Sequence, residues 1–195
     1  MGKKPSPLSR RRFIKAGGIA GALFAVGGLV IARGGGHGHY LALAPPNVDP
    51  LILSDKAFGV LCVLCDRVLP AKDPSDPTRP DAREARIAER IDKELTFHTP
   101  RMQKDVELAL LFLEHGGLMH ASTTRFTRLT PDGQDALLQK MLSGVQFERQ
   151  AVNALKLLAL FFYYADDRTW NGIHYAGPQG IARKRPPADS TPKPT

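Results

Sequence analysis

Apolar residues recur every three or four positions along most of residues 54–165, which is the periodicity of helices that bury one face. In the first such stretch, Phe58 and Leu61 follow this spacing, Ser54 is a suitable N-cap residue, and Pro70 cannot continue a helix. The pattern therefore predicts a helix between Ser54 and Pro70.

Four further helices are predicted by the same criteria. One opens at Asp81, and two start at Thr99-Pro100 and Thr130-Pro131, where a capping threonine precedes proline at the first helical position. The last helix, from about Phe147 to Ala165, is the most apolar. We expect it to form the centre of the bundle.

No segment shows sustained alternation of apolar and polar residues, so no strand is predicted. Residues 72–80 contain three prolines and no apolar residue, and we expect an exposed loop there. Residues 163–180 hold the only Trp and three of the four Tyr. The expected fold is all-α: a single bundle of about five helices after an N-terminal signal helix, with an irregular aromatic C-terminal segment.

The first 44 residues differ from the rest in charge. They contain seven Lys or Arg and no acid, and six of these cations precede or open an apolar run over residues 16–32. A basic region followed by an apolar run is the pattern of an export signal, and adjacent arginines are typical of the twin-arginine route. The residues assigned to this signal are Ser9, Arg10, Arg11, Arg12, Phe13, Ile14 and Lys15.

The signal has two candidate cleavage positions. Ala42-Leu43-Ala44 has the small-x-small form, although proline follows it, and Val30-Ile31-Ala32 is the second candidate. With the first, the chain divides into a signal and spacer over residues 1–44, a helical domain over 45–181 and a disordered Pro-, Lys- and Arg-rich tail over 182–195. Retention of the whole segment as a membrane anchor is the alternative.

The formal net charge of +8 comes mostly from the signal. Outside residues 1–44, 20 Lys and Arg stand against 19 Asp and Glu, which leaves a net charge of +1. A nucleic-acid-binding domain needs a concentrated basic face, so we expect no nucleic-acid partner.

Catalytic and metal-binding motifs are missing from the sequence. It contains no Gly-x-Gly-x-x-Gly, Walker loop, Cys-x-x-Cys-His or His-Glu-x-x-His, so we predict no catalytic residue, no metal site and no cofactor in this chain. Cys62 and Cys65 have redox-motif spacing but lie mid-helix among apolar residues. Three interpretations remain open: buried or interface thiols, a disulfide formed after export, and a redox or metal-binding role.

The aromatic C-terminal segment is a candidate binding surface, because Trp and Tyr are enriched at such surfaces. An alternative is a lid whose aromatic rings cover the bundle. The predicted partner-binding residues are Trp170, Gly172, Tyr175, Gly177 and Pro178.

Several motifs together resemble one known family. They are the twin-arginine signal, Phe58-Gly59-Val60-Leu61 running into Asp66-Arg67-Val68-Leu69-Pro70, then Phe126-Thr127-Arg128-Leu129-Thr130, and the ending Trp170-Asn171-Gly172-Ile173-His174-Tyr175-Ala176-Gly177-Pro178. Over about residues 55–180, the chain is similar to the gluconate 2-dehydrogenase subunit 3 family. It departs from the family at Arg79-Pro80-Asp81-Ala82, where members often carry a glycine-rich segment.

The resemblance implies a non-catalytic small (gamma) subunit that carries the export signal for a flavin-dependent large dehydrogenase subunit and stabilises it. FAD is then expected in the large subunit, and in many such complexes haem c is held by a multihaem cytochrome c subunit. The other expected partner is the twin-arginine translocase. The expected location is the periplasm, with attachment to the inner membrane through the complex or a retained signal.

Two other functions remain open at this point. One is a membrane-tethered structural or assembly protein that keeps its signal as an anchor. The other is a stand-alone periplasmic redox protein that uses Cys62 and Cys65.

Overall fold

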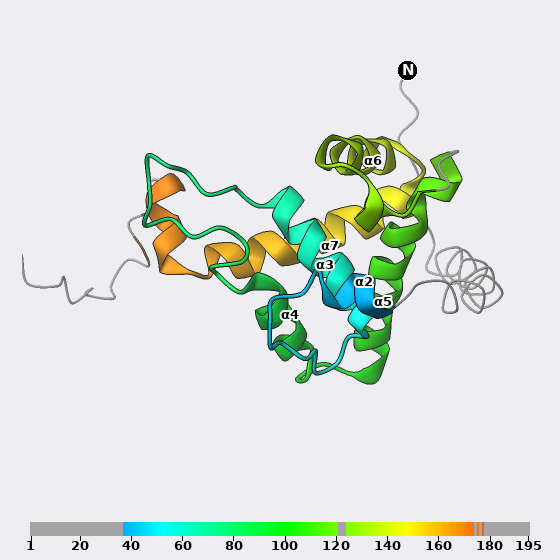
Figure 1. Cartoon of the computed structure of the whole chain (residues 1–195), viewed down its shortest axis with the longest axis horizontal. Helices are drawn as coiled ribbons and strands as arrows, with labels where there is room; N and C mark the ends of the chain where they lie inside the picture. Colours follow the sequence, from blue (N-terminus) through cyan, green and yellow to red (C-terminus); the bar gives the residue numbers. More distant parts are fainter. Residues whose placement is uncertain (1–36, 121–123, 174, 176, 178–195) are drawn as a thin grey trace, which may run out of the picture.

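The computed structural model describes residues 37–120, 124–173, 175 and 177, and in these ranges the chain forms helices without a β-strand (Figure 1). The all-α prediction is therefore confirmed. The α-helices are α2 (His37–Leu41), α3 (Asp55–Val68), α4 (Ile87–Leu95), α5 (Pro100–His115), α6 (Pro131–Ser143) and α7 (Gln146–Tyr164). The 3-10 helices are η1 (Gly116–His120), η2 (Phe126–Arg128) and η3 (Asp167–Ile173).

Helix α3 lies at the centre of the bundle. Its residues 57–65 are all buried, and α2, α4, α5, α6 and α7 pack against it (Figure 1). This stretch contains no charged side chain, so neighbours can cover every face of the helix without burying an unpaired charge.

The prediction that the last helix forms the centre is wrong. Helix α7 buries one stripe, to which Val152, Leu155 and Ala159 belong, and leaves Leu157 and Phe161 exposed at 66% and 69%. The helix carries more apolar residues than its single packed face uses. It therefore packs against α3, α4, α5 and α6 through one stripe and leaves a second apolar face exposed.

The predicted starts of three helices are confirmed by their caps. The side-chain oxygens of Ser54, Thr99 and Thr130 accept hydrogen bonds from backbone N–H groups in the first turn, at 3.3 to 3.4 Å. Pro100 and Pro131 follow two of these caps, at positions where a helix needs no N–H donor. Local signals therefore fix where α3, α5 and α6 begin.

The second predicted helix starts at Ile87, later than the expected Asp81. The Asp81 carboxylate does accept hydrogen bonds from the N–H groups of Arg83 and Glu84, at 2.9 and 2.8 Å, but these close a single turn. Arg86 then has a left-handed conformation with φ of 53°, which a right-handed helix cannot contain. The helix therefore restarts after Arg86.

The C-terminal aromatic segment is more regular than predicted. Tyr163 and Tyr164 still belong to α7, and residues 167–173 form η3 instead of an irregular loop. The Thr169 hydroxyl lies 2.7 Å from the carbonyl oxygen of Asp166 and 3.2 Å from that of Tyr163. This bonding holds η3 against the end of α7.

The sequence predicts that the helical domain begins at residue 45, but packed residues occur before that position. Tyr40, in α2, is 2% exposed and belongs to the core. The signal residues Ser9–Lys15 and the tail 182–195 lie outside the described residues. Within the described ranges, no helix has the length and apolar character that crossing a bilayer requires.

Truncation of a central α3 side chain should destabilise the bundle strongly. Leu61 is 0% exposed, so Leu61→Ala leaves a cavity and should lower the free energy of unfolding by about 2–5 kcal/mol. Leu118→Ala is the matched control, because Leu118 is 61% exposed, and should change that free energy by less than about 0.5 kcal/mol. Urea denaturation followed by circular dichroism measures both. Equal effects would contradict the central position of α3.

Candidate functional site

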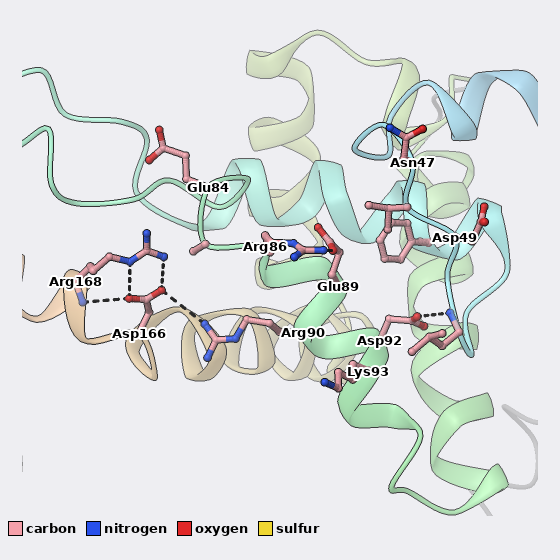
Figure 2. A pocket seen from close by; sticks show the side chains of 14 residues that line it. Asn47, Asp49, Glu84, Arg86, Glu89, Arg90, Asp92, Lys93, Asp166 and Arg168 are labelled. Carbon is pink, nitrogen blue, oxygen red and sulfur yellow. Dashed lines mark hydrogen bonds and ion pairs between the residues drawn. The ribbon is translucent and has the colours of Figure 1, made fainter.

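A charged cleft lies between the segment before α3, helix α4 and the end of α7 (Figure 2). Its volume is about 640 Å³. Most of its lining side chains are charged, and both signs are present. The lining residues are Asn47, Val48, Asp49, Leu51, Phe58, Glu84, Ala85, Arg86, Glu89, Arg90, Asp92, Lys93, Asp166 and Arg168.

At one end of the cleft, Asp166 is held by two arginines (Figure 2). Its carboxylate accepts hydrogen bonds from Nε and Nη2 of Arg168 at 3.0 and 2.7 Å and from the Arg168 backbone N–H at 3.1 Å, and Arg90 Nη1 lies 3.9 Å away. The hydrogen bonds from Arg168 lower the pKa of Asp166, which therefore stays ionised at neutral pH. This carboxylate fixes the first turn of η3 to α7 and, through Arg90, to α4.

At the other end of the cleft, the buried Asp92 binds the segment that precedes α3. Its carboxylate accepts hydrogen bonds from the backbone N–H groups of Leu51, Ile52 and Leu53, the last two at 3.2 and 2.9 Å. These bonds attach residues 51–53 to α4. The carboxylates at both ends of the cleft therefore hold elements together, and the cleft is a structural junction.

The predicted binding residues follow Arg168, a residue of this cleft, in the sequence. Trp170 is half-buried, and its indole N–H donates to the carbonyl oxygen of Tyr164 at 2.7 Å. Its ring meets the ring of Tyr175 edge to face, with centroids 5.1 Å apart, and Tyr175 is 46% exposed. The structure thus places an aromatic pair at the C-terminal end of α7, partly open to solvent. Pro178 lies outside the described residues.

Gly172 and Gly177 differ in what their positions require. At Gly172 the Arg79 side chain comes close, with Nη1 3.0 Å from where a Cβ would lie, so the Pro-rich loop (residues 72–80) packs against η3 there (Figure 1). Gly177 is buried and has φ of 98°, in the left-handed region. The Tyr163 hydroxyl adds a second contact, donating to the carbonyl oxygen of Pro80 at 3.0 Å. The Pro-rich loop is therefore attached to both α7 and η3.

A second candidate surface, the outer face of α7, was missed by the sequence analysis. Leu157 and Phe161 are exposed one turn apart and line a shallow groove of about 690 Å³. The other lining residues are Ala154, Leu158, Leu160, Tyr164 and Ala165. The signal in the sequence is the high apolar content of this helix, which is also the basis for the prediction of central burial.

Cys62 and Cys65 are buried in α3 as free thiols. Burial raises the pKa of Cys62 to about 12 and also raises the pKa of Cys65. Because the thiolate is the reactive and metal-binding form, such thiols are unreactive at neutral pH. Of the three interpretations, the geometry favours buried thiols.

Metal-ligating side chains do not converge in the part of the chain that the structure describes, where no group of three or more His, Cys, Asp or Glu could hold an ion. His115 instead lies 2.9 Å from the Nζ of Lys56. Burial, together with the nearby ammonium of Lys56, lowers the pKa of His115 to about 4. The imidazole is therefore neutral at pH 7, and its Nε2 can accept a hydrogen bond from the Lys56 ammonium. This contact gives His115 a structural role.

The sequence model of one protein family, gluconate 2-dehydrogenase subunit 3, matches residues 55–177, more than half of the chain. The chain belongs to this family. It is therefore a subunit of a dehydrogenase complex, and the predicted resemblance is confirmed. The matched range of this subunit runs from the first residue of α3 to Gly177, and includes the outer face of α7 and the Trp170–Tyr175 pair. No curated protein and no solved structure matches the chain.

Both thiols of the folded subunit should be inert toward a thiol reagent at neutral pH. The raised pKa of Cys62 and Cys65 leaves little thiolate, and burial blocks access. Two equivalents should react once urea unfolds the chain, and one equivalent in a Cys62→Ser variant. Absorbance of the released chromophore measures the reaction. Fast labelling of the folded chain would instead support the redox interpretation.

Proposed function

We propose that this chain is the non-catalytic small subunit of a flavin-dependent sugar or alcohol dehydrogenase complex. It supplies the catalytic large subunit with an export signal and a stabilising surface. Family membership supports this role, because the family is that of a dehydrogenase subunit. The contacts of the described residues also support a non-catalytic role. Asp92 and Asp166, at the two ends of the cleft, are occupied by backbone N–H groups or arginines, and both thiols are buried.

The observation that carries this proposal is the exposed outer face of α7. Leu157 and Phe161 lie on successive turns and line an apolar groove. Contiguous apolar surface in water is unfavourable by about 25 cal/mol for each Å², and such patches are typical of protein interfaces. A partner that covers this groove removes that cost.

The C-terminal segment extends the same surface. Tyr164 lines the groove, and its carbonyl oxygen accepts the indole N–H of Trp170, so the groove ends beside the Trp170–Tyr175 pair. Tyr and Trp residues beside exposed apolar residues such as Leu157 and Phe161 are typical of interface hot spots. We infer that the large subunit packs along α7 and against Tyr175.

Co-export gives the complex its location. The large subunit, already loaded with FAD, binds the bundle in the cytoplasm, and the signal at residues 9–15 directs the folded pair to the twin-arginine translocase. In the periplasm the small subunit remains bound. A cytochrome c subunit with haem c would then accept the electrons, and the complex or a retained signal holds the assembly at the inner membrane.

A charge on the outer face of α7 should release the large subunit. Phe161→Asp places a carboxylate in the apolar groove and should weaken binding by at least about 30-fold without unfolding the bundle, because position 161 is exposed. Phe97→Asp is the matched control, since Phe97 is 75% exposed between α4 and α5. Co-purification of a flavin-containing chain with the tagged full-length protein is the readout. Unchanged flavin recovery with Phe161→Asp would contradict the proposed interface.

The twin-arginine signal can be tested without changing its charge. Replacing Arg10, Arg11 and Arg12 with lysine should leave both this chain and the flavin-containing subunit in the cytoplasm. Arg33→Lys is the control, because Arg33 lies beyond the apolar run. Immunoblotting and flavin absorbance of cytoplasmic and periplasmic fractions measure the distribution. Normal periplasmic levels in the triple variant would rule out export by this route.

A further inference from the structure

Helix α2 is part of the folded domain, although a candidate cleavage motif follows it. Tyr40 packs against α3 at Gly59, where a Cβ would lie 3.0 Å from the Tyr40 carbonyl oxygen and 3.2 Å from the Tyr40 Cβ. Glycine in the middle of a helix is unfavourable, so its presence on this face fits the close approach of α2. The ammonium of Lys56, also in α3, lies 5.8 Å from the centre of the Tyr40 ring.

The Tyr40 hydroxyl is one of the donors to a buried carboxylate. Glu114, 0% exposed in α5, accepts a hydrogen bond from this hydroxyl at 2.7 Å. It also accepts bonds from the hydroxyl and the backbone N–H of Thr127, at 2.8 and 3.1 Å. A buried carboxylate that loses a donor is strongly destabilised. Loss of residue 40 would therefore weaken the core as well as expose it.

The backbone of the motif Ala42-Leu43-Ala44 is hydrogen-bonded within the folded domain. The N–H groups of Leu43 and Ala44 donate to carbonyl oxygens of α2, at 3.1 and 3.2 Å. The Leu43 carbonyl oxygen accepts a hydrogen bond from Arg83 Nη1 at 2.6 Å, and the same guanidinium binds the carboxylate of Asp66. Peptide recognition by strand addition requires an extended backbone with free N–H and carbonyl groups. The folded segment is turned instead of extended, and its N–H groups and the Leu43 carbonyl oxygen are already hydrogen-bonded.

We propose that residues 37–44 remain in the exported protein, and that any cleavage of the export signal takes place before His37. This inference rests on the proposed function for the existence of an exported form. A folded protein reaches the peptidase with α2 already docked, so the bond after Ala44 is protected. The other candidate motif, Val30-Ile31-Ala32, precedes His37 in the sequence and lies outside the described residues.

The N-terminus of the exported protein tests this proposal directly. The full chain with a C-terminal tag is produced in a bacterium that has the twin-arginine route and is recovered from the periplasm and the membrane. Mass spectrometry then identifies its N-terminal peptide. We expect every exported species to start at His37 or at an earlier residue, whether the signal is cleaved or retained. A species that starts at any residue from 38 to 45 would overturn the proposal.

The rate at which elastase cleaves the purified protein after Ala42 tests whether α2 is docked, and this test does not need export. A failure of this inference can therefore be distinguished from a failure of the proposed function. Elastase cleaves after small residues such as Ala42. The rate of this cleavage is proportional to the fraction of molecules in which α2 is undocked. Tyr40→Ala removes the side chain that docks α2, so it should raise the rate by about a hundredfold. Leu41→Ala is the matched control, because Leu41 is 49% exposed, and should change the rate by less than about threefold.

A milder variant keeps this test usable if Tyr40→Ala does not fold. Tyr40→Phe retains the ring and removes only the hydroxyl that binds Glu114, and should accelerate cleavage after Ala42 by about tenfold. If the folded wild-type chain is cut after Ala42 as fast as a heat-unfolded sample, α2 is not protected and the inference fails, whatever the export experiment gives.

Discussion

The arrangement of the bundle follows from the burial of α3 on every side. A helix whose residues 57–65 are all buried has no face left for solvent, so α2, α4, α5, α6 and α7 must all pack against it. Glu114 makes one of these contacts specific. Its buried carboxylate needs the Tyr40 hydroxyl and the Thr127 donors, so α2 cannot be exchanged for another apolar segment. The N-terminal side of the domain is thereby tied to α5 and η2.

Helix α7 shows the complementary situation, because it covers α3 with one face and leaves the other apolar face uncovered. The charged groups at the end of α7, Asp166, Arg168 and Arg90, bind one another and do not line this groove. Asp166 is engaged by Arg168 and Arg90, which fixes η3 and places the Trp170–Tyr175 pair at the end of the α7 groove. A rigid end and an apolar side are suited to holding another protein in one orientation. Both features are consistent with the stabilising role proposed above for this dehydrogenase subunit.

Local signals predicted part of this structure, and tertiary contacts decided the rest. The Thr99 and Thr130 caps are set by neighbouring residues, so they could be read from the sequence. The burial of Tyr40 could not, because its carboxylate partner is 74 residues away. The outer face of α7 was missed for a related reason: apolar content does not tell whether a second face meets the same chain or another one. Arg86 delays the start of α4 to Ile87, because it has a left-handed backbone conformation that could not be predicted from its residue type.

Gly59 has a consequence for the position of α2 in this subunit. Its missing side chain is the space in which the α2 backbone lies, at 3.0 Å from where a Cβ would stand. A residue larger than glycine at this position would require the α2 backbone to move away by a few tenths of an ångström. The residue at position 59 therefore sets how closely the N-terminal helix of the domain can lie against α3, and with it the distance between the Tyr40 hydroxyl and the Glu114 carboxylate.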